Sequence, residues 1–206
     1  MSSTSNMYGN VVPLIVEFLE VAIHGVLYYR KIYPEAIFTL KKKYDVPVHI
    51  SLYPELNNYI NETLKIIAKM LEIGSLDEVC ICFYDACLSP VEKLVLKLDA
   101  FDKSGDLSEA DPYLVNLREC FRAFMLKLSV STSYLASLPE NATFKILLRT
   151  TETTAVRVNL DPNFQEFPLI EVEPKENSPS DREILPLKTI VHDMIKINAY
   201  FQKKIS

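Results

Sequence analysis

Glycine is scarce in this sequence, with four glycines among 206 residues. Loops that hold phosphate groups depend on glycine, because their backbone must approach the phosphate closely and adopt conformations that other residues avoid. Neither a GxGxxG nor a GxxxxGK[ST] pattern occurs. The composition therefore argues against the common kinds of nucleotide-binding site.

Positive charge is also in deficit. The chain has 22 Lys and Arg against 27 Asp and Glu, which gives a formal net charge of −5 at pH 7. Direct binding to nucleic acid calls for a basic face. We therefore expect that contact with nucleic acid is not the main task of this protein.

Patterns that carry catalysis or hold metals are missing as well. The three histidines, His24, His49 and His192, lie far apart, and no HExxH, HxH or GxSxG spacing is present. Catalytic sites that are assembled only in space leave no such pattern, so an enzyme on an unrelated α+β fold stays open at this point.

Three of the four cysteines are close together, in the spacing CxC-x4-C that starts at Cys80. A structural metal site usually needs a fourth ligand at a comparable spacing, and the next cysteine, Cys120, lies in the middle of a predicted helix. Cys80 and Cys82 alternate with apolar residues of a predicted strand. We therefore expect reduced structural cysteines and no metal.

The N-terminus lacks the basic segment of a secretory signal, which favours an environment that keeps thiols reduced. The apolar run from Val11 to Tyr29 has nearly the length of a membrane span. Glu17, Glu20 and His24 recur in it at helical spacing, however, and form a polar stripe. We expect an amphipathic helix rather than a membrane span.

The chain is otherwise rich in core-forming residues: 49% are hydrophobic, with 11 Tyr and 10 Phe. The segment Asp111–Ser131 predicts a helix, with Asp111 as a candidate cap and Pro112 in the first turn. Its apolar stripe is wide and its back face is half apolar. We expect a central helix that carries the sheet on one side and meets other helices, or a second subunit, on the other.

Two more helices are predicted before it, from about Val12 to Lys31 and from Pro54 to the residues before Gly74. The stretch between them contains two prolines and the run Lys41–Lys43, and we expect an irregular connection with a solvated lysine run.

Alternation of apolar and polar residues predicts three strands, Val79–Tyr84, Val91–Leu98 and Phe144–Thr150, the first two as a hairpin. Asp99–Ala110 is acidic and predicts an exposed loop. The order helix, helix, strand, strand, helix, strand indicates an α+β layer with three helices on one face of an antiparallel sheet. For Leu187–Phe201 a helix and a strand fit the pattern equally well.

Several blocks of the sequence, taken in order, resemble the HORMA-domain accessory subunits of translesion DNA polymerase zeta. The blocks are FLEVAIHGVLYYRKIYPEAIF, KKYDVPVHIS, PELNNYI, PVEKLVLKL, RECFRAFMLKLSV and ILPLKTIVHDMIKINAYF. The resemblance implies a HORMA fold with three helices on an antiparallel sheet. It also implies a flexible tail at 1–10, a core at 11–150 and a mobile C-terminal safety belt at 151–206, which contains strands.

The resemblance further implies a non-catalytic adaptor with no cofactor. Its safety belt would enclose a proline-containing peptide of the catalytic subunit of DNA polymerase zeta. The peptide would contact Tyr59 on the predicted second helix and the belt residues Phe167, Pro168 and Leu169. Leu169 stands where the family has a tryptophan, which keeps an apolar contact but removes the indole.

Two other contact surfaces follow from the same resemblance. The C-terminal domain of the scaffold translesion polymerase would bind a face made of Ile184, Leu185, Pro186, Asn198 and Tyr200. A HORMA homodimer would use Arg122, Ala123 and Lys127 on the predicted central helix. Lys31 replaces an acidic residue of the family at that contact.

The resemblance also implies subunits of an end-protection complex in double-strand break repair, an AAA+ remodeller that acts on the N-terminal tail, and a role in cell-cycle control. No membrane partner is implied. We expect a nuclear location, with the cytoplasm and spindle as further sites. A spindle-checkpoint-type HORMA signalling protein is the alternative.

Overall fold

The computed structural model describes residues 8–99, 110–150, 182–192 and 195–204. Three long helices lie in these ranges: α1 (Tyr8–Tyr29), α2 (Pro54–Glu72) and α3 (Ala110–Ser131). Short 3-10 turns follow at η1 (Glu35–Ile37) and η2 (Thr132–Tyr134). The strands are β1 (Phe38–Lys43), β2 (Val46–Ser51), β3 (Leu76–Tyr84), β4 (Pro90–Asp99), β5 (Thr143–Thr150), β6 (Arg182–His192) and β7 (Ile195–Lys204).

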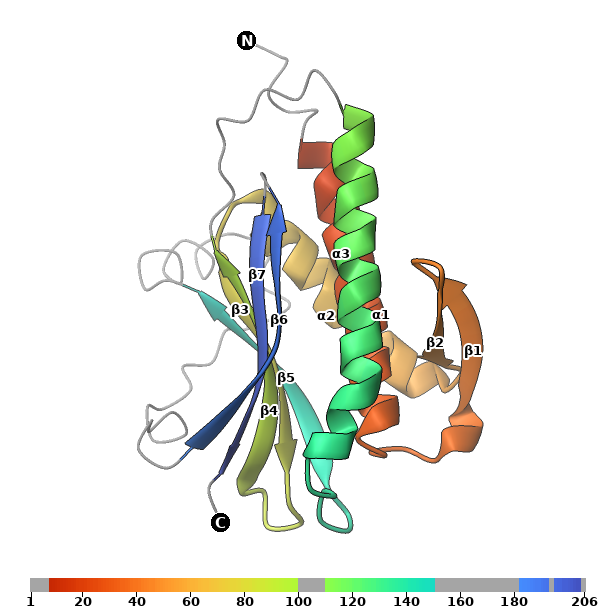
Figure 1. Ribbon diagram of the computed structural model, residues 1–206. Coiled ribbons are helices and arrows are strands. Elements are labelled where there is room, and N and C mark those ends of the chain that lie inside the picture. The colour runs from red at the N-terminus through yellow and green to blue at the C-terminus, as the bar shows by residue number, and fades with distance from the viewer. Residues whose placement is uncertain (1–7, 100–109, 151–181, 193–194, 205–206) are drawn as a thin grey trace.

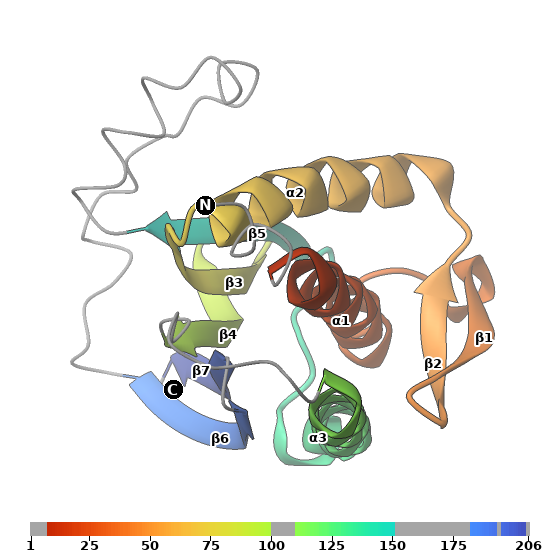
Figure 2. The same cartoon turned by 90° about the horizontal axis from the view of Figure 1, so that it is seen from above.

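Five strands form one antiparallel sheet in the order β5-β3-β4-β7-β6, and β1 and β2 form a separate hairpin. The three long helices cover one face of the large sheet (Figure 1), and the hairpin packs on the far side of the helices (Figure 2). The α+β class and the predicted strands β3, β4 and β5 are confirmed.

Strict alternation along the strands places one apolar face of the sheet under the helices. On β3, Val79, Ile81 and Phe83 are fully buried in this main core. Successive side chains of a strand point to opposite faces, so Cys80 and Cys82 lie on the other face. There they form a second, smaller buried cluster with Tyr84 and Val95.

Helix α1, rather than α3, is the central helix. It lies between α2 and α3 in Figure 2, and Phe18 on it stacks on Phe121 of α3 at 4.2 Å between ring centroids. Its polar stripe is covered by the hairpin: the Ser51 N–H donates to Nδ1 of His24 at 3.4 Å, and Lys43 Nζ lies 2.8 Å from Glu17 Oε1. The prediction that α3 is the central helix was wrong. Helix α3 does carry the sheet, through β6, and meets α1, but its half-apolar back lies at the surface, where contact with a second subunit stays a prediction.

The prediction of an irregular connection was also wrong, whereas the lysine run is solvated as expected, with Lys41 and Lys42 exposed. Lys41–Lys43 belong to β1, which pairs with β2 from Phe38↔Ser51 to Lys43↔Val46. The two-residue turn consists of Tyr44 and Asp45, both with positive φ, at 49° and 58°. Hairpin turns of this kind usually carry Asn-Gly or Asp-Gly, so a turn without glycine gave no signal.

The predicted helix ends agree with the structure better at the C-terminus than at the N-terminus. Helix α2 ends before Gly74, whose φ is 67°, and the Ser75 N–H donates back to the Met70 carbonyl at 2.8 Å. This is the expected glycine-terminated end. Helix α1 already begins at Tyr8, inside the predicted tail, and the described part of α3 begins at Ala110, so that Asp111 lies within the helix.

The C-terminal segment contains strands, which settles the two patterns that fitted Leu187–Phe201 equally well. β6 and β7 pair from Arg182↔Lys204 to His192↔Ile195, with a register shift between Pro186 and Lys188. Buried Ile195, Ile197 and Phe201 on β7 alternate toward the helices. Residues 100–109, most of the predicted acidic loop, and 151–181, the first part of the predicted belt, lie outside the described residues.

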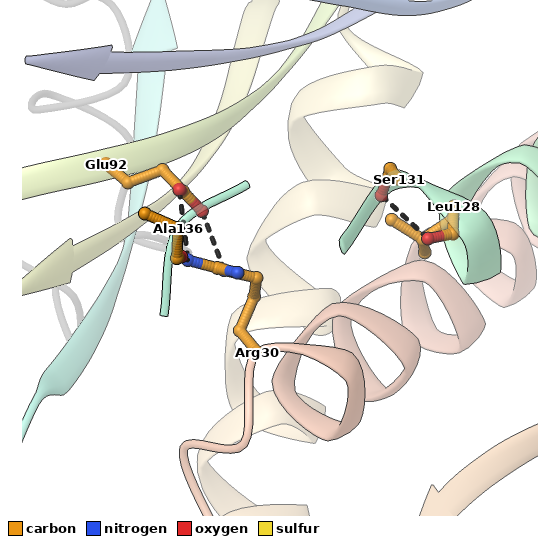
Figure 3. A network of polar contacts seen from close by, with 5 residues as sticks. All are labelled: Arg30, Glu92, Leu128, Ser131 and Ala136. Carbon is orange, nitrogen blue, oxygen red and sulfur yellow. Dashed lines mark hydrogen bonds and ion pairs between the residues drawn. The ribbon is translucent and has the colours of Figure 1, made fainter. Parts of the chain in front are cut away.

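One buried ion pair connects the end of α1 to the sheet. Arg30 Nε lies 2.8 Å from Glu92 Oε1, and both side chains are 4% exposed. Arg30 Nη2 donates to Glu92 Oε2 at 3.1 Å and to the Ala136 carbonyl at 2.8 Å. Figure 3 shows the Arg30 guanidinium reaching both groups; nearby, the Ser131 hydroxyl donates to the Leu128 carbonyl at the end of α3. The pair joins α1, β4 and the segment after α3.

Candidate partner-binding surfaces

Strand β5 forms one edge of the five-stranded sheet, and α2 runs alongside it (Figure 2). Tyr59 on α2 leans over this edge with 42% of its surface exposed. Its hydroxyl oxygen accepts a hydrogen bond from the Ile146 N–H of β5 at 3.0 Å. The aromatic residue that the resemblance assigns to peptide binding therefore lies at an edge of the sheet that the described residues form, which is where an extended peptide can add as a strand.

A row of aromatic rings continues from Tyr59 along the start of β5. Phe144 packs edge-on against Tyr59 at 5.8 Å and against Tyr33 at 6.2 Å, and Tyr33 lies 6.4 Å from Tyr53. Burial, and then the neighbouring Tyr59, raise the pKa of Tyr33 above its usual value. These rings form an apolar wall beside the β5 edge. Wide apolar rings suit the flat side chains of proline and aliphatic residues.

The opposite edge of the sheet is poorly suited to strand addition. It is β6, which carries Pro186 and a register shift between Pro186 and Lys188. Proline has no N–H to donate, and bulges and edge lysines discourage pairing with another strand. Strand β5, TFKILLRT, contains no proline or glycine. The pairing of β5 with β3 shifts register only at one end, between Leu76 and Glu78 of β3, so β5 is regular from Thr143 to Arg149.

The belt residues predicted to close over the peptide, Phe167, Pro168 and Leu169, lie outside the described residues. Their assignment stays a prediction.

Most of the predicted scaffold-binding residues share one face of β6 and β7. Pro186 pairs with Tyr200 across the two strands, and Ile184 on the same face is 56% exposed. Asn198 also lies on this face, where its amide donates to Asp99 Oδ2 at 3.0 Å. Leu185 points the other way and packs against the main core. Four of the five residues thus form a surface, and Leu185 supports it from behind.

This face is continuous with the second buried cluster of the sheet. Tyr200 packs against the cluster made of Cys80, Cys82, Tyr84 and Val95. Burial, and then Glu78 and Cys80, raise the pKa of Tyr200. Half-buried tyrosines are typical of interface residues, because they combine a large apolar ring with a polar group.

The predicted dimer residues lie on the outward side of α3. Arg122 and Ala123 are half-buried and Lys127 is exposed. Arg122 forms a loose ion pair with Glu119 at 3.6 Å. On either side of this pair along the helix, Val115 and Leu126 are 61% and 50% exposed. The back face of α3 is therefore an exposed, mixed apolar and charged surface. The structure describes one copy of the chain, so its use in a dimer stays a prediction.

The residues that sequence reasoning singled out for metal binding or catalysis do not assemble into a site. The described residues hold no group of three or more His, Cys, Asp and Glu side chains that suits a metal ion. Burial raises the pKa of the Cys80 thiol to about 12, which makes it unreactive. Burial, and then Lys41, lower the pKa of His24 to about 4, so this core histidine is neutral at pH 7.

In the described residues, one helical stretch, Val11–Tyr29, has the length and hydropathy of a membrane span. In this fold it is the central helix α1, packed between α2, α3 and the hairpin. Its apolar character is thus accounted for by the protein core.

Sequence reasoning missed three parts of the β5 site, namely Ile146, Phe144 and Tyr33. The alternating pattern of β5 gave the strand but not its place at an edge, because strand order depends on pairing between distant segments. The pattern around Tyr33-Pro34 indicated only a helix end. The aromatic residues around Tyr59 come from separate segments of the chain, so no spacing in the sequence indicates that they meet.

The HORMA domain model matches residues 12–168. The chain is 35% identical over 199 residues to the human mitotic spindle assembly checkpoint protein MAD2B, which covers 96% of this chain and 93% of the relative. It is 30% identical over 180 residues to DNA polymerase zeta subunit 2 of Drosophila melanogaster, covering 86% and 89%.

Solved structures agree at the level of the fold. A chain of the mitotic checkpoint complex matches with a TM-score of 0.79 at 18% identity, covering 95% of this chain and 99% of that chain. Caenorhabditis elegans HTP-2 bound to the HIM-3 closure motif matches with a TM-score of 0.72 at 12% identity, covering 96% and 92%. From the sheet, the three helices and these matches it follows that the chain belongs to the HORMA-domain family, in the group that includes MAD2B and DNA polymerase zeta subunit 2.

Proposed function

We propose that this HORMA protein is an adaptor subunit of translesion DNA polymerase zeta. In this role it holds a proline-containing peptide of the catalytic subunit along the edge of β5 and presents the β6–β7 face to the C-terminal domain of a scaffold polymerase. The fold, the family and a non-catalytic adaptor role are established by the comparisons. The peptide, its enclosure by residues 151–206 and the scaffold contact are the proposal.

The observation that carries the proposal is the edge of β5, regular from Thr143 to Arg149, with Tyr59 beside it. A peptide that adds to a sheet edge gains backbone hydrogen bonds, and pockets for alternate side chains give specificity. The aromatic row of Tyr59, Phe144, Tyr33 and Tyr53 supplies such an apolar wall. HTP-2, which shares this fold, is bound to a closure motif, and the fly relative is named a polymerase zeta subunit.

A belt that crosses over the bound peptide makes release slow, because the belt must unpair before the peptide can leave. Affinity is then expressed mainly in the dissociation rate. The strands β6 and β7 follow directly after the proposed belt crossing and pair with β4 through β7. For the peptide to be released, the belt must therefore separate against the pairing of β6 and β7 with the sheet.

Tyr59→Ala tests the peptide site. We expect the variant to bind a proline-containing peptide of the catalytic subunit at least about tenfold more weakly, since a partly buried aromatic contact contributes roughly 1–3 kcal/mol. The melting temperature should change little, because the ring is 42% exposed. Tyr134→Ala is the control, since Tyr134 is 70% exposed at the end of α3.

The measurement is fluorescence-detected peptide binding to the full chain, followed by dissociation against excess competitor. Release over minutes to hours supports an enclosing belt, and release within a second contradicts it. A well-folded wild-type protein that binds no such peptide refutes the proposal.

A spindle-checkpoint role is the second candidate. It is favoured by the name of the human relative and by the structural match to a chain of the mitotic checkpoint complex. Affinity purification from mitotic and from DNA-damaged cells separates the two roles. Recovery of polymerase subunits supports the adaptor role, and recovery of checkpoint proteins alone supports the alternative.

The wider roles suggested by the resemblance belong to the same proposal. The protein would be located in the nucleus, with the cytoplasm and spindle as further sites, and would take part in double-strand break end protection and cell-cycle control. It would be remodelled by an AAA+ protein and would form a HORMA homodimer. The exposed back of α3 supports the last of these.

A further inference from the structure

The hydrogen bond between Tyr59 and Ile146 is unusual in kind, because a side chain accepts from a backbone N–H at an edge strand of the described sheet. The bond is 3.0 Å long and joins residues 87 positions apart. Edge strands expose unpaired N–H groups that invite pairing with other chains. Here one such group already has a partner within the protein.

The pairing of β5 with β3 shows which backbone groups face the free edge. Ile146 lies opposite Ile81, and its N–H points away from β3 because it reaches Tyr59. In an antiparallel pair, alternate residues direct their backbone groups to the same side. Phe144 and Leu148 therefore direct theirs to the free edge as well, while Leu147, opposite Cys80, directs its own toward β3. The Tyr59 hydroxyl thus occupies the middle of the edge that a peptide would use.

We propose that the Tyr59 hydroxyl is a removable cap on this edge. In the free protein it holds the Ile146 N–H; on binding, a carbonyl group of the partner peptide takes its place. The inference rests on the proposed peptide site and adds a specificity-determining role for the hydroxyl, separate from that of the ring.

The cap has two consequences for recognition. A peptide gains from displacing it only when one of its carbonyl groups lies opposite Ile146, so a segment that pairs only with other parts of the edge leaves the cap in place. A peptide without an apolar side chain to pack against the rings of Tyr59 and Phe144 does not compensate for the lost hydrogen bond between Tyr59 and Ile146. The cap also protects the edge from unspecific pairing while no partner is bound.

The ring and the hydroxyl therefore have opposite effects on peptide affinity. The ring, supported by Phe144 at 5.8 Å, forms part of the wall and favours binding. The hydroxyl must release the Ile146 N–H before the peptide can bind there. Loss of this one neutral hydrogen bond lowers the peptide affinity by a factor of roughly five to ten. Tyr59→Phe removes only the hydroxyl, and Tyr59→Ala removes both.

The first test needs no partner. Amide hydrogen exchange of the free full-length protein is measured by NMR for the wild type, Tyr59→Phe and the control Tyr53→Phe, whose hydroxyl bonds to the Glu55 carboxylate instead. We expect the Ile146 amide to exchange about tenfold faster in Tyr59→Phe only. The Leu147 amide, which points toward β3, serves as the internal reference. Equal Ile146 exchange in all three proteins overturns the cap.

The second test uses the proline-containing peptide of the catalytic subunit. Tyr59→Phe should bind it about five- to tenfold more tightly than the wild type, and Tyr59→Ala more weakly. In the wild-type complex, a scalar coupling across the hydrogen bond should connect the Ile146 nitrogen to a carbonyl carbon of the peptide. Weaker binding by Tyr59→Phe, or an Ile146 amide still bonded to Tyr59 in the complex, overturns the proposal. Absence of peptide binding by every variant refutes the proposed function and leaves the exchange result standing.

Discussion

Arg30→Ala breaks the buried ion pair between α1 and β4 and leaves Glu92 without its cation. Both side chains are 4% exposed, and Arg30 also supplies the donor for the Ala136 carbonyl. Removing one partner of a buried pair costs about 3–5 kcal/mol, because the remaining charge is uncompensated. A chain of this size loses roughly 2–4 °C of melting temperature per kcal/mol, so we expect a decrease of roughly 6–20 °C.

The pH dependence of this variant identifies the cause. Burial raises the pKa of Glu92, and the Arg30 guanidinium opposes that rise. Without Arg30 the pKa of Glu92 rises further, so the folded state binds a proton more readily than the unfolded state. The stability deficit of Arg30→Ala should therefore be largest at pH 7 and shrink as the pH falls toward the raised pKa of Glu92.

Urea unfolding of wild type and variant at pH 7 and pH 5 measures both effects. Lys65→Ala is the matched control, because its partner Glu62 and Lys65 itself are 48% and 66% exposed, and an exposed pair contributes less than about 1 kcal/mol. A loss for Arg30→Ala no greater than that of Lys65→Ala, or a deficit that grows as the pH falls, would refute the assignment of a buried, charged pair.

Three further predictions concern α3, the β6–β7 face and the core histidine. Arg122→Ala should shift a HORMA dimer toward monomer without loss of peptide binding, and unchanged mass by light scattering would reject the role of Arg122. Ile184→Asp should weaken binding of the scaffold polymerase C-terminal domain at least about tenfold by placing a charge in the 56% exposed apolar contact, with an unchanged melting temperature; equal calorimetric affinities would contradict this. His24 has its pKa lowered to about 4, so the unfolded state binds more protons between pH 6.5 and 4, and stability should fall across this window as the pH is lowered, by about 3 kcal/mol in total. His24→Phe should flatten this part of the pH profile of urea unfolding, and an unchanged slope would exclude His24 as its source.

The fold could be predicted from the sequence where periodicity is local. Alternation gave β3, β4 and β5, and the glycine after α2 gave the end of that helix. The position of each element in space could not be predicted from such local patterns. Helices α1 and α3 both have apolar residues on more than one side, and only the position of the β1–β2 hairpin makes α1 the covered one. The turn of that hairpin, Tyr44-Asp45, adopts positive φ without glycine, so the sequence contained no signal for it.

For the candidate sites as well, individual residues could be named from the sequence, whereas their contacts in space could not. Tyr59, Ile184, Pro186, Asn198 and Tyr200 were named from the resemblance, and the structure places them on two distinct surfaces. The partners of Tyr59 were not predictable, because the contact with Ile146 joins distant parts of the chain. Leu185 was assigned to the surface with its neighbours, although the alternation of side chains along a strand turns it toward the core.

The two edges of the sheet differ in a way that sets how many chains can assemble through it. If both edges were regular, the β5 edge of one molecule could pair with the β6 edge of the next, and such head-to-tail contacts repeat without closing into filaments. Pro186 and the irregular register beside it spoil one half of that contact. Repeated β5-to-β6 contacts between copies of the described sheet are therefore disfavoured, and under the proposed function β5 is the edge that takes up an extended segment.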